Sequence, residues 1–415
     1  MRIGILTAFS GMVEHYSLTR VVLDQLRMIK RAGHHPVLIT LSDFKASDLP
    51  DYVEVVAVVP RFIKIDYKSM MDLSQEHAEL VPSIQSGLRE VVKDLDAVLT
   101  HDIIFTGWNL PINLAVQQVA GEFEIPWFHW VHSVPGGERR DFWTLPPNSK
   151  LIYPNYTDRR RCGEHFGVFE SDVLVVPHCL DARDFLLMTD AARFLVNECD
   201  LLEADFVQTM PIPTDRMESK GVDQVIPIFG KLKKLGHKVR LIVVNADCGN
   251  DAARNKVDNS RIACRLVGLD DDDVVFTSRE LKHYALGVPN AVVRDLMLVS
   301  NLFICPTKSE TFGFTMAEAA LTGQLLVLNA DLPAVVELAG AQNALFFHFG
   351  SYQQQTFCPD EDRFNLDVAK IIVNTFENDL ALKAKNHYKR TYRSDRVWRA
   401  IEAAIVARAR ETHAK

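Results

Sequence analysis

Short apolar runs alternate along the chain with longer segments in which apolar residues recur every three or four positions. Such runs between polar boundaries are typical of strands buried on both faces, and the longer segments are typical of helices packed on a sheet. The first instances are a strand at 2–8, a helix at 18–31 that Gly33 ends, and a strand at 36–40. This order of strand, loop, helix and strand predicts a parallel sheet of the doubly wound α/β class.

The alternation continues and then starts again after a candidate hinge at 175–181. Before the hinge it predicts a helix at 110–123 and further strands at 52–59, 97–100, 125–129, 151–153 and 173–176. After the hinge it predicts strands at 206–209, 238–244, 274–276, 302–305, 325–328 and 345–347. Helices are predicted there at 222–235, 313–321, 331–339 and from 366 onward. The duplication predicts two Rossmann-like domains that face each other across a cleft.

The predicted domains are an N-terminal one at 1–180, a C-terminal one at 181–390, and a C-terminal helix at 391–415 that crosses back to the first domain. This last helix is rich in alanine and basic residues. We expect it to pack across the domain junction, and contact with a membrane or nucleic acid is the alternative. Its arginines are Arg393, Arg396, Arg399, Arg408 and Arg410.

The composition fits a globular protein, since 47% of the 415 residues are apolar and 24% are charged. The net charge of -8 argues weakly against a surface that binds nucleic acid all over. The seven cysteines form no Cys-x-x-Cys pair, which favours free thiols in a reducing compartment. The chain enters a strand pattern at once and has no apolar run of transmembrane length. We therefore expect a cytoplasmic protein.

Two carboxylates, Glu310 and Glu318, stand eight positions apart after the apolar run at 302–305. The predicted helix start near Gly313 puts Glu310 in a loop at the carboxyl end of a strand, where open α/β sheets bind ligands. The backbone N–H groups at 311–314 would suit phosphate oxygens. An isolated pair of carboxylates is usually just solvated. In this setting, however, acceptors for hydroxyls and donors for phosphates come together, as a nucleotide sugar requires.

Two further clusters point the same way. Arg216 and Lys220 lie in a turn between a predicted strand and helix, where both can approach one diphosphate, unless the turn is merely polar. His129 and His132 lie at a strand end, and we favour His132 because it follows the strand. A histidine near an apolar run is more often a core residue. Gly11, after the first strand, would let a ligand approach the backbone.

Several classes of function are disfavoured because the sequence lacks their motifs. Neither a Gly-x-Gly-x-x-Gly fingerprint nor a Walker sequence occurs, which argues against a dinucleotide oxidoreductase and an ATPase. The acidic run at 270–273 is interpreted as a solvated turn, so we predict no metal site. The segment at 136–143 is either an acceptor-binding loop or an ordinary surface loop.

The segment from Glu310 to Glu318, with Phe312-Gly313 and Ala317 inside it, resembles the Glu-x7-Glu motif of retaining nucleotide-sugar glycosyltransferases of GT-B fold, the glycogen-synthase-like family 4 group. The resemblance covers nearly the whole chain and is strongest at 295–340. Arg216 together with Lys220-Gly221 is similar to the family's phosphate clamp, and 176–185 is similar to its interdomain segment. The chain departs from the family at Ser10-Gly11, where a Gly-Gly pair is usual, and at His178-Cys179, where Asn-Gly is usual.

The resemblance implies roles for individual residues. Arg216 and Lys220 would bind the diphosphate, Glu318 the ribose, Glu310 the donor sugar, and His132 would lie beside the anomeric carbon. The remaining donor-binding residues that it implies are Gly11, Ser278, Arg279, Thr311, Phe312, Gly313 and Phe314. The expected catalytic residues are His132, Glu310, Arg216 and Lys220. Candidate acceptor residues are His15, His101, His129, Arg139 and Arg140.

These roles imply a glycosyltransferase that moves a hexose from a UDP- or GDP-linked sugar, such as UDP-glucose, to a hydroxyl with retention of configuration. No cofactor and no metal are expected. The acceptor stays open among a glycan, a lipid, a small molecule, a protein and a modified nucleic-acid base. A phosphorylase or a non-transferring nucleotide-sugar-binding protein of the same fold is the alternative, and an epimerase ranks lower.

Overall fold

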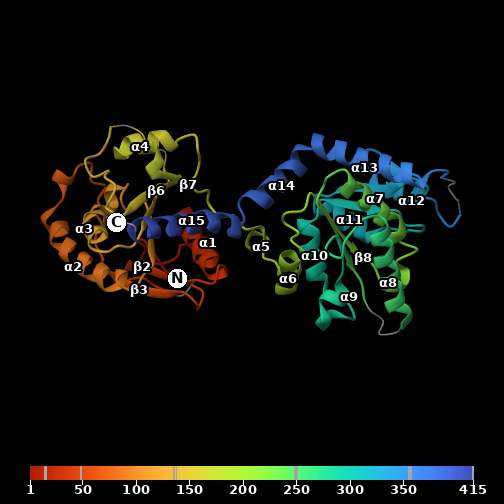
Figure 1. Cartoon of the computed structure of the whole chain (residues 1–415), viewed down its shortest axis with the longest axis horizontal. Helices are drawn as coiled ribbons and strands as arrows, with labels where there is room; N and C mark the ends of the chain where they lie inside the picture. Colours follow the sequence, from red (N-terminus) through yellow and green to blue (C-terminus); the bar gives the residue numbers. More distant parts are fainter. Residues whose placement is uncertain are drawn as a thin grey trace. The chain divides into compact units, whose positions relative to one another are not determined.

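The computed structural model describes residues 1–13, 16–46, 49–133, 136, 138–246, 251–353 and 358–413, with side chains up to 407 except that of Lys282. Its contacts divide the chain into two compact units (Figure 1). Unit 1 comprises Met1–Asp181 and Tyr392–Lys415, and unit 2 comprises Ala182–Thr391.

Unit 1 is built on a parallel sheet of seven strands in the order β3-β2-β1-β4-β5-β6-β7. The strand order reverses between β1 and β4, which is the position where doubly wound sheets bind ligands. The strands are β1 (Arg2–Leu6), β2 (His35–Leu41), β3 (Glu54–Val59), β4 (Ala97–His101), β5 (Trp127–Trp130), β6 (Ser149–Tyr153) and β7 (Val173–Val175).

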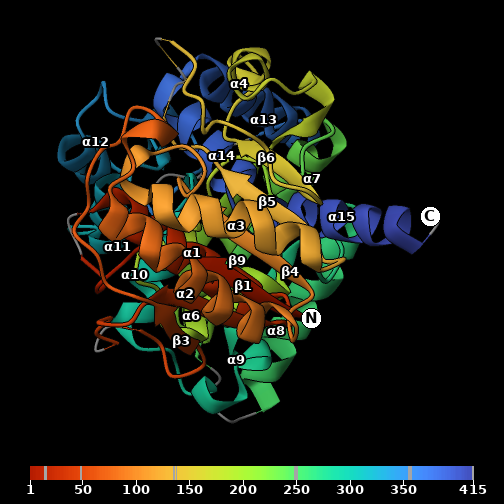
Figure 2. The ribbon, with the colours of Figure 1, turned by 90° about the vertical axis from the view of Figure 1, so that its left-hand side faces the viewer.

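Helices cover both faces of this sheet. Ile5 of β1 belongs to a core with α1 and α15, whereas Leu6, which points the other way, belongs to a core with α2 and α3. Figure 2 shows α2 and α3 in front of these strands. The elements are α1 (Ser17–Arg31), η1 (Met70–Asp72), α2 (Gln75–Val92), η2 (Gly107–Asn109), α3 (Leu110–Glu122), α4 (Arg159–Phe166), η3 (Glu170–Asp172) and α15 (Ser394–His413).

The C-terminal helix α15 is fastened to unit 1 at both polar and apolar positions. Trp398 and Ile401 are buried in the core that α1 shares. His34 lies 3.1 Å from Glu402 and against the Trp398 ring. The hydroxyl of Ser394, at the start of the helix, donates to Asp181 over 2.7 Å. The end of the chain is thus part of the first unit.

Unit 2 contains two parallel ladders, β10-β9-β8 and β11-β12-β13. They are joined because Asn301 N–H donates to the Val207 carbonyl over 3.0 Å and the Gln208 amide bonds both backbone groups of Ile304. The strand order therefore reverses between β8 and β11. The strands are β8 (Phe206–Pro211), β9 (Val239–Val244), β10 (Val274–Phe276), β11 (Leu302–Cys305), β12 (Leu325–Asn329) and β13 (Leu345–Phe347).

The helices of unit 2 follow its strands as a doubly wound sheet requires. Those before β10 are α5 (Ala182–Phe185), α6 (Asp190–Glu198), η4 (Thr214–Arg216), α7 (Val222–Lys234) and α8 (Asp251–Leu266). Those after it are α9 (Thr277–Glu280), η5 (Lys282–Tyr284), α10 (Asn290–Val299), α11 (Phe314–Leu321), α12 (Pro333–Ala339), α13 (Glu361–Asn378) and α14 (Leu380–Thr391).

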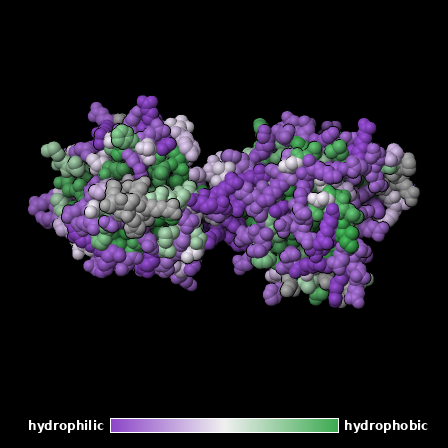
Figure 3. All heavy atoms as spheres, in the orientation of Figure 1, coloured by the Kyte–Doolittle hydropathy of each residue, from purple (hydrophilic) through white to green (hydrophobic). Residues whose placement is uncertain are grey.

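The predicted α/β class with parallel sheets is confirmed. Among the longer helices, α2, α4, α6, α8 and α10 were not predicted. Helix α2 has buried apolar residues at helical spacing, namely Ile84, Leu88, Val91 and Val92, but Pro82 stands inside it. The described buried residues of α8 are only Ala253, Val257 and Cys264. Polar residues dominate the visible faces in Figure 3, with apolar patches between them. Among the described residues, no helix combines the length and apolar content needed to cross a membrane.

Candidate functional site

In unit 2, the loops after β8 and β11 pack against each other where the strand order reverses. Lys308 N–H donates to the Ser219 carbonyl over 2.9 Å. Gly221 has a φ of 74°, and a Cβ there would lie 2.8 Å from the carbonyl oxygen of Pro306. Both the left-handed backbone and the close approach require glycine. The two loops are thus held together at the carboxyl ends of the strands.

An ion pair joins the same two loops. Lys220 Nζ lies 2.8 Å from Glu310 Oε2, and Glu310 Oε1 accepts the Thr311 N–H over 3.0 Å. Burial opposes the charge on Glu310, but the hydrogen bonds from Lys220, Thr311 and Phe312 outweigh burial and lower the pKa of Glu310. The cation and the carboxylate that the sequence singled out, 90 positions apart, therefore meet.

Helix α11 begins beside this ion pair. Its N-cap, Gly313, has a φ of 76°, and no described side chain caps the helix. The first N–H groups therefore suit an anion. Gly313, Lys220 and Glu310 line a cavity of about 50 Å³ with apolar side chains of β8 and β11. The exposed rings of Phe312 and Phe314 follow one another here, with centroids 4.8 Å apart.

Arg216 and Glu318 do not line this cavity. Arg216 ends η4 and is exposed, and Glu318 is exposed on α11. Glu310 precedes α11, so the two carboxylates do not share a helical face. Both exposed side chains are accessible to a ligand. Neither is described above in an ion pair or hydrogen bond of the kind that fixes Glu310.

A buried asparagine that the sequence analysis did not select ties three strand ends together. Asn245 follows β9, and its Nδ2 donates to Thr214 Oγ1 over 3.0 Å and to Ser278 Oγ over 2.9 Å. The hydroxyl of Ser278 is therefore engaged inside the unit. Arg279, next to it, is exposed and paired with Asp258. The sequence feature that could have identified Asn245 is its position as a polar residue directly after a buried strand.

In unit 1, three imidazoles stack at the carboxyl ends of β4 and β5. His101 Nδ1 lies 2.9 Å from His132 Nε2, and His101 Nε2 lies 2.9 Å from Gln25 Oε1. His132 stacks on His178, with centroids 5.0 Å apart. Burial, followed by the neighbouring imidazoles, lowers the pKa of His101 well below its usual value and that of His132 to about 3. These two rings are neutral. Of the two facing nitrogens, His101 Nδ1 and His132 Nε2, one must carry the proton and the other accept it, so the tautomer of one ring fixes that of the other.

Asp102, which the sequence analysis also missed, follows His101 at the end of β4. Its φ is 53°, a conformation that aspartate tolerates better than most residues. Its Oδ1 accepts the His132 N–H over 3.0 Å. Burial raises the pKa of Asp102 to about 6, and this hydrogen bond offsets only part of the effect. The signal was its position directly after a predicted strand.

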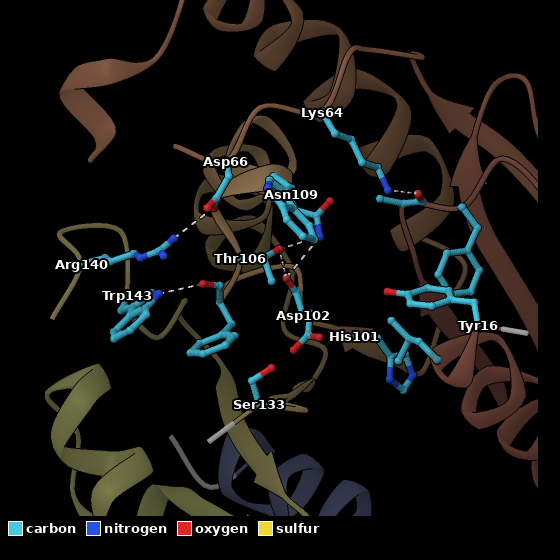
Figure 4. Close-up of a pocket in the computed structure, with 15 residues that line it drawn as sticks. Tyr16, Lys64, Asp66, His101, Asp102, Thr106, Asn109, Ser133, Arg140 and Trp143 are labelled. Atoms are coloured by element: carbon cyan, nitrogen blue, oxygen red, sulfur yellow. Dashed lines mark hydrogen bonds and ion pairs between the residues drawn. The ribbon is translucent and has the colours of Figure 1, made fainter. Parts of the chain in front are cut away.

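Asp102 and His101 line a pocket of about 340 Å³, shown in Figure 4. Arg140 also lines it, and its Nη1 lies 3.3 Å from Asp66 Oδ1. The other labelled side chains around the pocket are aromatic or polar, namely Tyr16, Lys64, Thr106, Asn109, Ser133 and Trp143. This pocket lies where the strand order of unit 1 reverses, so each unit has a cavity at the same topological position.

One predicted acceptor residue belongs to the interior of the sheet. His129 is fully buried, with Nδ1 2.8 Å from Thr100 Oγ1 and Nε2 3.0 Å from Ser149 Oγ. Burial lowers its pKa to about 3. We no longer expect His129 to contact an acceptor, because both of its nitrogens are engaged inside the sheet.

Two further predicted residues of unit 1, Arg139 and Gly11, do not line the pocket. Arg139 donates to two backbone carbonyls and does not line the pocket. Gly11 forms a parallel bridge with Lys45 and has room for a Cβ, so the fold itself does not require glycine there. His15 lies outside the described residues.

The acidic run after α8 is engaged in ion pairs. Asp271 pairs with Arg261, and Lys233 lies 2.6 Å from both Asp270 and Asp273. In the described part of the chain, no three His, Cys, Asp or Glu side chains gather as metal ligands. The described cysteines are free thiols.

The sequence matches no protein-family model and no curated protein at a significant level. Solved structures do match over nearly the full length. One is a glycosyltransferase from Rickettsia africae, with 12% identity, 98% of each chain covered and a TM-score of 0.37. Another is HepE of Anabaena in complex with UDP, with 14% identity, 98% of this chain and 100% of that chain covered and a TM-score of 0.34. A third is the UDP-forming α,α-trehalose-phosphate synthase of Burkholderia vietnamiensis, with 12% identity, 98% and 99% covered and a TM-score of 0.34.

Proposed function

We propose that the protein is a glycosyltransferase of GT-B type that moves a hexose from a nucleoside-diphosphate sugar to a hydroxyl acceptor with retention of configuration. The observation that carries the proposal is the Lys220–Glu310 ion pair beside the uncapped start of α11. A cation and free helix N–H groups suit a diphosphate, and a carboxylate suits sugar hydroxyls. Unit 2 would bind the donor and unit 1 the acceptor.

The roles follow from charge and position. Lys220 and the exposed Arg216 would bind the diphosphate. Glu310 and the N–H groups at 311–314 would bind the hexose, and Glu318 would bind the ribose. Lys220 is now paired with Glu310, so a phosphate would compete for its protons, and donor binding would release the carboxylate towards the hexose. The nucleobase would lie near Ser278 and Arg279.

The chemistry needs little beyond these contacts. The bond between the anomeric carbon and the diphosphate oxygen breaks, and the acceptor oxygen bonds to that carbon on the same face. The acceptor's proton passes to the departing diphosphate oxygen, so no separate general base is required. Lys220, Arg216 and the start of α11 stabilise the charge that develops on the leaving group. His132, which is neutral, would donate or accept a hydrogen bond beside the anomeric carbon and would not supply charge.

The test is donor binding by the whole chain. UDP-glucose, GDP-mannose and the free sugars are added separately, and thermal unfolding is followed together with release of the nucleoside diphosphate. A donor at a hundred times its Kd should stabilise the fold by about 2.7 kcal/mol. Lys220→Ala should lose this stabilisation, whereas Lys234→Ala, an exposed lysine on α7, should keep it.

Each outcome has a defined meaning. A folded sample that no nucleotide sugar stabilises would refute the proposal. Stabilisation without any hydrolysis or transfer would favour the non-transferring binding protein. Release of sugar phosphate from an oligosaccharide and inorganic phosphate would identify a phosphorylase.

A further inference from the structure

The pocket of unit 1 contains more hydrogen-bond acceptors than its own walls satisfy. Asp102 uses one carboxylate oxygen for the His132 N–H. The Asn109 amide donates to the Asp102 carbonyl over 3.3 Å and to Thr106 Oγ1 over 3.0 Å. Asn109 is only 9% exposed, and its Oδ1 has no partner among the described residues. A buried acceptor without a donor is costly, so this wall favours a ligand rich in hydroxyl groups.

The charges around the pocket are nearly balanced before any ligand binds. Arg140 Nη1 is paired with Asp66 and also donates to the Tyr67 carbonyl over 3.2 Å. Lys64 Nζ donates to the Ala8 carbonyl over 2.8 Å, and burial lowers the pKa of Lys64. On the lining, Lys64 and Arg140 are offset by Asp66 and Asp102, and these opposite charges leave no positive excess for a phosphorylated ligand. They also disfavour a cationic ligand, because the Lys64 ammonium lines the same pocket.

Aromatic rings provide the rest of the surface. Trp108, in η2, is 52% exposed, and Tyr16 is 47% exposed. The Trp143 and Phe105 rings, which also line the pocket, stack on each other with centroids 5.1 Å apart. Accessible aromatic faces beside a carboxylate and an amide suit a pyranose, which has apolar C–H faces and a polar rim of hydroxyls. The volume of about 340 Å³ lies at the lower end of small-ligand pockets.

We propose that this pocket binds a neutral pyranose sugar, with Asp102 and Asn109 accepting its hydroxyl protons and Trp108 packing on its C–H face. Calling this sugar the acceptor of glycosyl transfer rests on the proposed function, but the binding itself does not. The reaction would then build a glycan or a glycoside on an existing sugar unit.

The binding test uses the full chain without any nucleotide. Methyl glucoside, methyl galactoside and methyl mannoside are tested one at a time by saturation-transfer NMR and by tryptophan fluorescence. Glucose 6-phosphate and tetramethylammonium serve as the anionic and cationic probes. We expect at least one methyl glycoside to bind, and we expect neither charged probe to displace it.

Two variants locate the ligand. Trp108→Ala removes an exposed ring and should weaken glycoside binding about tenfold or more. Asp102→Asn keeps one oxygen for the His132 N–H and tolerates the left-handed backbone, but it loses the carboxylate and should weaken binding similarly. Phe169→Ala and Asp51→Asn, which change an exposed ring and an exposed carboxylate of unit 1 elsewhere, should bind as the wild type does.

The outcomes separate this proposal from the proposed function. Glycoside binding that is lost in both variants and kept in both controls supports it, whether or not UDP-glucose binds to unit 2. Binding that survives Trp108→Ala with the fold intact would overturn it, even if Asp102→Asn fails to fold. Tight binding of tetramethylammonium or glucose 6-phosphate alone, or no glycoside binding by the wild type, would also overturn it.

Discussion

Each unit has a cavity at the same topological position, but different side chains line the two cavities. In unit 2, a lysine, a charged carboxylate and a helix start surround about 50 Å³. In unit 1, one neutral imidazole, a buried carboxyl, several aromatic rings and the offset charges of Lys64, Arg140 and Asp66 surround about 340 Å³. The reversal of strand order supplies the place, and the residues after each strand decide what it can bind.

The most direct way to break this comparison is to remove the charge in unit 2. Glu310→Ala should lower donor turnover by about a hundredfold or more, because the carboxylate is the group we assign to the donor hexose. The measurement is nucleoside-diphosphate release under saturating donor. Glu337→Ala, an exposed glutamate on α12, is the matched control and should be unchanged. Equal activity of both variants would remove Glu310 from the site.

The contact between the two loops of unit 2 can be tested by adding one methyl group. Gly221→Ala combines a left-handed backbone with a clash against Pro306 and should lower the free energy of unfolding by about 4 kcal/mol. Gly236→Ala has a φ of 94° but meets nothing within 4 Å, so it should cost only about 1–2 kcal/mol. Urea denaturation measures both. Similar costs would mean that the loops do not press together.

The buried carboxyl of unit 1 predicts a pH effect of its own. The folded state binds the Asp102 proton more tightly than the unfolded chain does. The protonated carboxyl therefore adds to the free energy of unfolding below about pH 4, and this contribution is lost as the pH rises to about 6 and above. The loss reaches about 3 kcal/mol at most. The buried histidines act in the opposite direction, because their lowered pKa values reduce stability as the pH falls below 6.5.

The contribution of Asp102 is therefore measured by difference. Unfolding free energies of the wild type and of Asp102→Asn are compared between pH 4 and pH 7, and the variant should gain stability relative to the wild type as the pH rises. Parallel pH curves would contradict the raised pKa.

The smallest expected effect tests how unit 2 aligns its strand ends. Asn245→Ala leaves Thr214 and Ser278 without their shared partner and should lower the free energy of unfolding by about 2 kcal/mol. Asn255→Ala, at an exposed position of α8, should change it by less than about 0.5 kcal/mol. No difference between the two variants would mean that water replaces the asparagine without loss.

Local pattern was enough for the strands, because buried parallel strands are short apolar runs whatever surrounds them. It missed α2, where Pro82 is a helix-breaking signal inside an otherwise helical spacing, and α8, which buries few apolar residues. It selected Lys220 and Glu310 by residue type and position. It did not select Asp102 or Asn245, because a single polar residue after a strand is also what an ordinary loop contains.

The sequence by itself determined the alternation of elements, the repetition of the doubly wound half, and the loops in which reactive side chains follow strands. Only the tertiary structure decided which of those side chains meet. It paired Lys220 with Glu310, left Glu318 exposed and enclosed His129 in the sheet. The physical reason is that strand order and burial depend on contacts between residues far apart in the chain, whereas helix and strand patterns depend on neighbours within a few positions.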